Sequence, residues 1–249
     1  MSSKAQDLNN WQPRPLPGSP TLAGRFVTLE PLSALRHTHG LWLDTQGHDE
    51  VWAWLGDGPY RSESEFGAAL ATKESGISAR FWAILPKDIL SASDHAADQA
   101  ADQPTAAAAG YASLMRMDPA NGVIEVGNVL FAPSLQRTPA ATEAMYLMAR
   151  HVFEELGYRR YEWKCNALNL PSRRAAERLG FTFEGIFRQH MIVKGKNRDT
   201  AWFSMLDVEW PKRKQAWEAW LSPDNFDPEG RQGFRLGTIP EGADEAVPR

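Results

Sequence analysis

The order of the segments in this sequence predicts an α+β fold in a single domain, built on a mostly antiparallel sheet of about seven strands flanked by helices. Short apolar runs of alternating character indicate strands, and longer segments with a recurring apolar face indicate helices. Two pairs of strand-like runs follow each other across polar turns, which favours antiparallel hairpins. A mostly antiparallel sheet interrupted by helices defines the α+β class.

The composition favours a compact globular protein. The chain has 249 residues, 43% hydrophobic and 23% charged, which suffices for one sizeable core. The net charge of −4 argues against nucleic acid or an anionic membrane as a partner. The single cysteine, Cys165, excludes a disulfide within the chain and fits a reducing compartment. Residues 1–10 lack the apolar run of a secretory signal, and no apolar stretch approaches the roughly 18 residues of a membrane span, so we expect a cytoplasmic protein.

The N-terminal part is predicted to be an extended arm followed by two helices between two strands. Prolines at 13, 15, 17 and 20 disfavour a helix in residues 1–22. Ser62 is followed three residues later by Glu65, the capping-box pattern of a helix start. The predicted elements are strands at 25–29 and 81–85 and helices at 32–44 and 62–74.

Residues 87–109 break this pattern, because Ala, Asp and Ser dominate them without a periodic apolar face. We expect a flexible insertion in the loop between two strands, not a separate domain.

The C-terminal part carries the strongest helix signal, at 139–156, which ends at Gly157 as a helix C-terminal glycine should. The other predicted elements are strands at 110–117, 123–131, 160–165, 181–193 and 201–208, a polar turn at 194–199, and helices at 172–179 and 211–221. The domain organisation that we expect is an arm at 1–22, one domain at 23–210, and a terminal helix with an extended tail at 211–249.

One strand–loop–helix unit suits anion binding. The unpaired N–H groups and the dipole of a helix N-terminus attract phosphate. Thr138 is a suitable N-cap, and Pro139 suits the first helical position. Ala140 and Ala141 are small enough to let a pyrophosphate approach the backbone. An ordinary capped helix has the same pattern, so this unit alone does not decide the function.

Two motifs resemble those of the GNAT acetyltransferase superfamily, and within it the ribosomal-protein N-terminal acetyltransferases called RimJ/RimL. The family motif Q/R-x-x-G-x-G/A stands here as the six residues Gln136-Arg137-Thr138-Pro139-Ala140-Ala141. The family's N-x-x-S and L-G-F stand as Asn169, Ser172 and Leu179-Gly180-Phe181. By element order the resemblance covers residues 24–210, and it is most specific from Glu125 to His190.

The resemblance implies acetyl-CoA as cosubstrate, with its pyrophosphate bound by Gln136, Arg137, Thr138, Ala140 and Ala141. Pro139 departs from the family glycine and, having no N–H, removes one phosphate donor. We expect the Arg137 side chain to compensate, because charge-assisted contacts to phosphate are stronger than neutral ones.

The resemblance also assigns roles around the thioester. Asn169 would bind the pantetheine arm, and Ser172 would lie near the sulfur. Backbone groups of Val129, Leu130 and Phe131 would contact the acetyl end, as an oxyanion hole does. The tyrosine that serves many family members as general acid is absent, since Ala176 occupies its position.

Glu125 is the predicted general base, since a carboxylate can take the proton of an attacking amine directly or through water. It alternates with Val123 and Gly127 and should share their face of the strand. Glu125 and Ser172 are thus the two predicted catalytic residues. An exposed or ion-paired carboxylate is the alternative for Glu125.

Several alternatives remain open from the sequence. The acceptor could be a protein N-terminus or a small amine, and a non-catalytic acyl-CoA-binding regulatory module is the competing function. An acyl-enzyme at Cys165 is disfavoured, because direct amine attack needs none. His37, His39 and His48 lack metal spacing, so we expect no metal. A homodimer is plausible from the surplus of tryptophan, ten in all. Trp52, Trp54 and Trp82 either pack in the core or line a substrate cleft.

Overall fold

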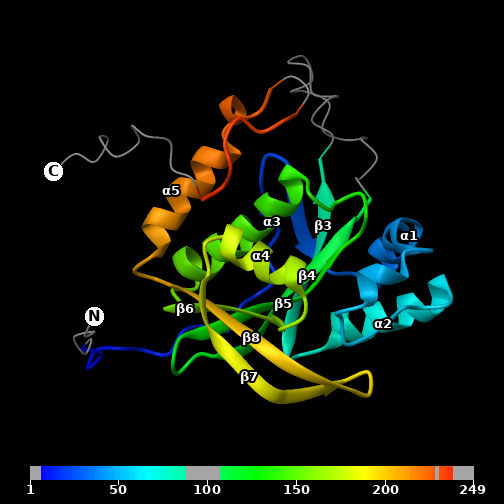
Figure 1. Ribbon diagram of the computed structural model, residues 1–249, viewed down its shortest axis with the longest axis horizontal. Helices are drawn as coiled ribbons and strands as arrows, with labels where there is room; N and C mark the ends of the chain where they lie inside the picture. Colours follow the sequence, from blue (N-terminus) through cyan, green and yellow to red (C-terminus); the bar gives the residue numbers. More distant parts are fainter. Residues whose placement is uncertain (1–6, 88–106, 228–229, 238–249) are drawn as a thin grey trace.

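The structure is a computed structural model that describes residues 7–87, 107–227 and 230–237. Its centre is an eight-stranded sheet in the order β1-β2-β3-β4-β5-β6-β8-β7, flanked by helices on both faces (Figure 1). Every neighbouring pair of strands is antiparallel except β5 and β6, which are parallel. The predicted α+β class is confirmed, and the strand beyond the expected seven is the two-residue β1.

The strands are β1 (Leu22–Ala23), β2 (Val27–Pro31), β3 (Ala79–Pro86), β4 (Gly110–Asp118), β5 (Val123–Phe131), β6 (Arg160–Asn166), β7 (Thr182–Val193) and β8 (Lys196–Leu206). The helices are α1 (Ala34–Thr45), α2 (Glu63–Ser75), α3 (Pro139–Arg150), α4 (Leu170–Arg178) and α5 (Trp210–Leu221). Short turns of helix lie at η1 (Asp49–Trp52), η2 (His151–Glu155, a π-helix) and η3 (Pro223–Asn225).

The two faces of the sheet carry different partners. In Figure 1, α1 and α2 lie together on one side of the sheet, and α3, α4 and α5 lie on the other side. Ile124 and Val126 of β5 belong to the larger core, which includes α3 and α5. The residues between them in sequence point the other way, because side chains alternate along a strand. Glu125 therefore lies on the face of the sheet opposite α3.

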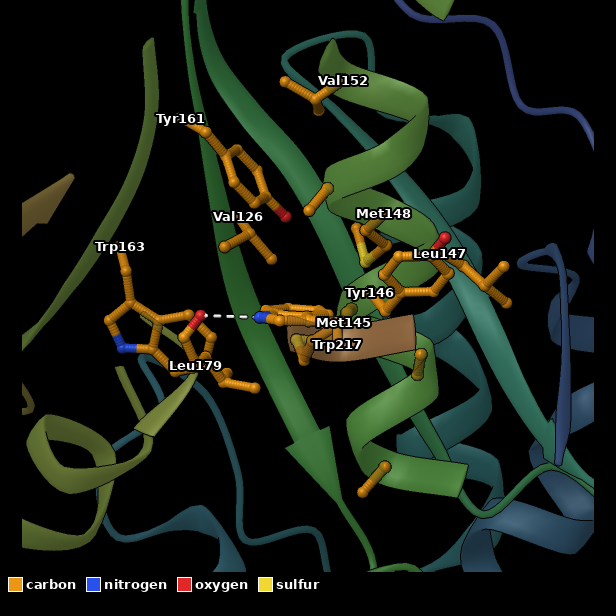
Figure 2. Packing of buried hydrophobic residues seen from close by; sticks show 14 of the residues in the cluster. Val126, Met145, Tyr146, Leu147, Met148, Val152, Tyr161, Trp163, Leu179 and Trp217 are labelled. Atoms are coloured by element: carbon orange, nitrogen blue, oxygen red, sulfur yellow. Dashed lines mark hydrogen bonds between the residues drawn. The ribbon is translucent and has the colours of Figure 1, made fainter. Parts of the chain in front are cut away.

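The core below α3 fixes this helix against β5 and β6. Figure 2 shows Met145 and Met148 of α3 facing Val126 and Tyr161 of the two strands. Every residue from Ala140 to Ala149 is buried, so α3 is covered on more faces than its predicted apolar stripe requires. The extra cover comes from α5, whose aromatic side chains stack on α3.

Glu143 ties the outer side of α3 to the start of β2. Its carboxylate accepts hydrogen bonds from the backbone N–H groups of Arg25 (2.8 Å), Phe26 (2.5 Å) and Val27 (3.0 Å). The side chain is 5% exposed. Three donors satisfy a charge whose burial would otherwise cost several kcal/mol, roughly 3 to 5 for an uncompensated ion.

The last hairpin differs from its prediction. The turn consists of Lys194 and Gly195 alone, both with positive φ, as a two-residue hairpin turn requires. Residues 196–199, predicted as turn, belong to β8. Their polar character misled the prediction, because these four residues are exposed or only partly buried and so carry no apolar alternation.

The segment after α5 also differs from the extended tail that we expected. Residues after Ser222 form η3 and then a bridge between Phe226 and Gln232. Phe226 stacks edge-on against Phe26, and Leu236 is buried in the main core. Apolar side chains scattered in a Pro/Gly-rich sequence have no periodicity, so their burial could not be predicted.

The described part of the predicted N-terminal arm has a turn at Asn9–Asn10 and then runs without helix along the domain, on which it packs. The Trp11 indole donates to Ala120 O at 2.7 Å, and Tyr158 OH donates to Pro15 O at 3.0 Å. Most of the predicted insertion lies outside the described residues. Its described end is ordered, since Ala109 N donates to Ile84 O at 2.9 Å.

Two of the three singled-out tryptophans pack in the core. Trp82 is fully buried and donates from its indole to Pro20 O at 2.8 Å, and Trp52 is 3% exposed. Trp54 is 42% exposed. Within the described parts of the chain, no helix has the length and apolar character needed to cross a membrane.

Candidate functional site

The two parallel strands at the centre of the sheet separate halfway along their length. Their pairing runs only over Val123–Val126 and Arg160–Trp163. Beyond Val126, a bulge at Asn128, whose φ is 49°, breaks the register of β5 with β4 and bends the strand. The two strands therefore splay apart beyond these pairs, and we call the gap in the sheet between the end of β5 and the end of β6 the notch.

Glu125 lies at the last stretch of paired strand before this notch. Its side chain is 5% exposed, with Lys164 Nζ 2.9 Å and Arg116 Nε 3.5 Å from Oε2. Burial raises the pKa of Glu125, and the charges of Lys164 and Arg116 oppose that rise. Gly127 leaves it room, because a Cβ there would lie 3.3 Å from Glu125 Oε1 and 2.6 Å from Met115 Sδ. Of the alternatives for Glu125, an exposed carboxylate is wrong and an ion-paired one agrees with its two cationic neighbours; its role as general base stays a prediction.

Lys164 continues the network across the sheet. Its ammonium is 4% exposed, lies 2.6 Å from Glu162 Oε2, and sits 3.8 Å from the centre of the Trp202 ring. Arg160 Nε lies 2.7 Å from the other Glu162 oxygen and its Nη1 lies 2.8 Å from Glu184. Sequence analysis missed Lys164, because the alternation that singles out Glu125 says nothing of which β6 side chain lies beside it.

The β7–β8 hairpin borders the face of the sheet on which Glu125 and Lys164 lie. At its tip, Lys194 Nζ donates to Trp52 O at 2.8 Å, which joins the hairpin to η1. An open hollow of about 750 Å³ runs along the hairpin. It is lined by Ile186, Phe187, Arg188, Gln189, Asn197 and Asp199. Phe187 stacks on Trp202 at 4.5 Å, so the hollow borders the charged network without containing Glu125.

The loop before α3 is held by its own side chains. Thr138 Oγ1 donates to Leu135 O at 2.7 Å and accepts from Ala141 N at 3.2 Å, which confirms Thr138 as N-cap. Gln136 Nε2 donates to Phe131 O at 3.0 Å. Pro139 occupies the first helical position, as predicted.

The remaining residues of this loop divide between solvent and core. Arg137 is exposed, has a φ of 62°, and makes no ion pair within the described residues. Ala140 and Ala141 are each 7% exposed and belong to the main core. Their small size therefore also serves the packing of α3.

Arg178 was not singled out from the sequence. It lies in the last turn of α4, yet its Nη1 donates to Thr142 Oγ1 at 3.1 Å, in the first turns of α3. Its guanidinium lies 5.0 Å from the centre of the Trp220 ring. No sequence signal reveals this position, because it depends on how α4 packs against α3.

At the start of α4, Asn169 is the N-cap, and its Oδ1 accepts from Ser172 N at 3.1 Å. The Trp163 indole donates to Ser172 Oγ at 3.0 Å. Cys165 lies close by and is buried, and this burial raises the pKa of its thiol. A protonated thiol is a poor nucleophile, which weighs against the acyl-cysteine alternative.

The backbone groups predicted at the end of β5 lie along the notch. Leu130 and Phe131 pair with Tyr111 and Gly110 of β4, whereas Val129 lies in the bulge and has no partner in the β4 register. Glu125 thus lies on one face of the sheet, and Ser172 and the α3 loop lie towards the other. Across the part of the chain that the structure describes, no group of three or more metal-ligating side chains occurs.

Comparison with known proteins gives consistent matches. A family model described as acetyltransferase (GNAT) domain matches residues 27–182. The crystal structure of a GCN5-related N-acetyltransferase from Brucella melitensis superposes with a TM-score of 0.83 at 47% identity, over 92% of this chain and 97% of that one. A structure described as a probable GNAT-family acetyltransferase from Chromobacterium violaceum has a TM-score of 0.72 at 38% identity, over 85% of this chain and 98% of that one.

One curated protein is similar over a shorter stretch. "Putative ribosomal N-acetyltransferase YdaF" of Bacillus subtilis is 31% identical over 105 residues, which are 42% of this chain. The match spans 57% of that protein's length.

Proposed function

The chain belongs to the GNAT acetyltransferase family and is an acetyl-CoA-dependent N-acetyltransferase, and we propose that it transfers the acetyl group to a primary amine by direct attack in a ternary complex. The observation that carries this mechanism is the buried Glu125 carboxylate beside the notch between β5 and β6. Acetyl-CoA, when bound, supplies an activated acetyl thioester. The residues of the chain bind it, position the amine and move the protons.

Glu125 is the proposed general base. A primary amine is protonated at neutral pH and must lose a proton to become nucleophilic, and a carboxylate with a raised pKa accepts that proton more readily than an ordinary one. The charges of Lys164 and Arg116 oppose that rise in pKa and so favour the ionised form that a base needs.

Ser172 is the proposed proton donor to the leaving sulfur, since the family tyrosine is replaced by Ala176. The Trp163 indole donates to Ser172 Oγ, so the hydroxyl hydrogen is free to point elsewhere. Backbone N–H groups of Val129 and Leu130 are the proposed donors to the carbonyl oxygen, where negative charge develops during attack. Trp163 acts through Ser172 and is a positioning residue.

The residues around the start of α3 fit the phosphates of acetyl-CoA. The helix N-terminus attracts anions, and Pro139 withholds only one of its N–H groups. Arg137, exposed beside it, and Arg178, near its first turns, are two guanidinium groups within this region. We propose that both contact phosphate oxygens, with Gln136 and Thr138 holding the loop. Asn169 would contact the pantetheine arm through its amide nitrogen.

The acceptor is proposed to be a protein N-terminus or a small amine. The name of the B. subtilis relative refers to a ribosomal acceptor, which favours a protein N-terminus here as well. The open hollow beside the charged network offers space for more than a minimal amine.

The test is a mass-spectrometric assay of the full chain with acetyl-CoA against a panel of small amines and N-terminal peptides. Glu125→Gln should keep acetyl-CoA binding by calorimetry and lose turnover by roughly 100-fold or more, the usual contribution of a general base. Glu177→Gln, an exposed carboxylate on α4, is the matched control and should retain activity.

Two results would contradict the proposal. Saturable acetyl-CoA binding without turnover of any acceptor would favour a non-catalytic acyl-CoA-binding module. Equal turnover by the Glu125→Gln variant and the unmodified chain would remove Glu125 from the mechanism.

A further inference from the structure

A cluster of cationic side chains lies on the same face of the sheet as Glu125. It comprises Arg116 of β4, Lys164 of β6 and Arg198 of β8. His190 of β7 lies beside it, because Arg198 Nε donates to Thr200 Oγ1 at 3.2 Å and His190 Nδ1 lies 2.9 Å from the same oxygen. We call Arg116, Lys164 and Arg198 the cationic cluster.

The carboxylates of this face do not neutralise the cationic cluster. Glu125 and Glu162 share the Lys164 ammonium, and Glu162 is also bound by Arg160. Arg160 in turn pairs with Glu184. Each of these three carboxylates therefore already has a cationic partner.

Two guanidinium groups are left under-paired. Among the described carboxylates, Arg116 pairs only with Glu125, whose Oε2 lies 3.5 Å from its Nε. Arg198 forms no ion pair within the described residues. A local excess of positive charge in a chain of net charge −4 is not a general property of its surface.

Burial makes this excess costly. Arg198 is half-buried, and both burial and the nearby Arg116 charge lower the pKa of its guanidinium, which nevertheless remains protonated at neutral pH. Burial and the three cations Arg116, Arg198 and Lys164 also lower the pKa of His190, so His190 is neutral at pH 7. The positive charge of the cluster therefore comes from guanidinium and ammonium groups, and a bound anion would offset the cost of their desolvation.

The anion cannot be a phosphate of the cosubstrate at the start of α3. Ile124 and Val126 face α3, and Glu125, between them, faces the cluster. The cluster thus faces the side from which an amine reaches Glu125. The fork of a guanidinium matches the two oxygens of a carboxylate.

We propose that the acceptor is a primary amine that itself carries a carboxylate, and that Arg198 and Arg116 bind this carboxylate while Glu125 takes the amine proton. This inference rests on the proposed acetyl transfer to an amine. A free amino acid and a peptide with an acidic side chain next to its N-terminus share this chemistry. The hollow along the hairpin has room for the rest of a peptide.

The test compares acceptors matched in size that differ in charge. Glycine is paired with glycinamide, and peptides beginning Ser-Glu are paired with those beginning Ser-Gln. We expect kcat/KM of the carboxylate member to exceed that of its amide partner by roughly tenfold or more, as a charge-assisted contact implies. A preference confined to glycine identifies the free amino acid as acceptor, and one confined to the peptides identifies the N-terminus.

Variants test whether Arg198 causes the preference for carboxylate acceptors. Arg198→Met should bring the ratio between carboxylate and amide acceptors close to one, through a higher KM for the carboxylate member, and Arg198→Lys should restore part of the ratio. Lys212→Met removes an exposed cation from α5 and should leave the ratio unchanged. If amide acceptors have the same kcat/KM as their carboxylate partners, the inference is overturned and the proposed acetyl transfer stands.

A binding measurement covers the case in which no acceptor in the panel is turned over. With CoA present, N-acetylglycine should bind the full chain more tightly than N-acetylglycinamide by calorimetry, and Arg198→Met should abolish the difference. Equal binding of the two compounds would overturn the inference independently of turnover. Absence of turnover would contradict the proposed function alone.

Discussion

Replacing Lys164 by Met should raise the pKa of Glu125 and move the acid limb of the pH–rate profile upward. Burial is the main cause of the raised pKa of Glu125, and Lys164 is the main charge that opposes it. At 2.9 Å and an effective dielectric constant of about 20, their attraction is about 6 kcal/mol before desolvation. Arg116 remains in Lys164→Met and still opposes the rise, so the further rise in the pKa of Glu125 reflects the loss of the Lys164 charge alone.

The assay is kcat/KM measured from about pH 5 to about pH 9, with acetylated product followed by mass spectrometry. Activity requires the ionised carboxylate, so it is lost as pH falls through the pKa of Glu125. In Lys164→Met this loss should occur at higher pH. Lys212→Met is the matched control, and its profile should coincide with that of the unmodified chain. An unmoved acid limb in Lys164→Met would show that Glu125 is not the titrating base.

The free energy of unfolding gives a second test of the contact between Lys164 and Glu125. Because the folded pKa of Glu125 is raised, the folded carboxyl holds its proton over a window in which the unfolded one has lost it, and stability falls as pH rises through that window. Lys164→Met extends the window upward, so the loss of stability should be larger at pH 8 than at pH 5, reaching about 3 kcal/mol in urea denaturation. The double variant with Glu125→Gln should recover part of this loss, since neither buried charge remains uncompensated.

Three further changes have defined outcomes. Glu143→Gln should lower the free energy of unfolding by about 2 to 4 kcal/mol in urea denaturation, since three backbone donors lose a charged acceptor. An unchanged denaturation midpoint would show that these three hydrogen bonds do not stabilise the fold. Trp163→Phe should lower kcat several-fold at constant KM for acetyl-CoA, because Ser172 loses the donor that orients its hydroxyl; unchanged kcat would show that Ser172 needs no orientation. Arg178→Met should weaken acetyl-CoA binding by roughly tenfold in calorimetry. If this variant weakens the binding of CoA and of dephospho-CoA by the same factor, Arg178 contacts the pyrophosphate.

The elements with a local signal were predicted closely. β5 spans the predicted residues 123–131, and Thr138 and Pro139 open α3 as predicted, whereas α4 begins at Leu170 and not at the predicted residue 172. Apolar alternation, capping residues and terminal glycines act over a few residues, so the sequence alone displays them. The polar end of β8 and the folded-back tail after Ser222 lacked such a signal and were predicted wrongly.

The same division holds for the site. The sequence by itself determined that Glu125 shares a face with Gly127 and that Thr138 caps the helix that follows β5, because these are properties of a single strand and a helix end. Only the tertiary structure decided that Lys164 lies against Glu125, that Arg178 reaches the first turns of α3, and that Arg198 lacks a carboxylate partner in the described chain. Those contacts join residues from different strands and helices, and the pKa of a buried carboxylate depends on which charges the fold brings within a few ångströms of it.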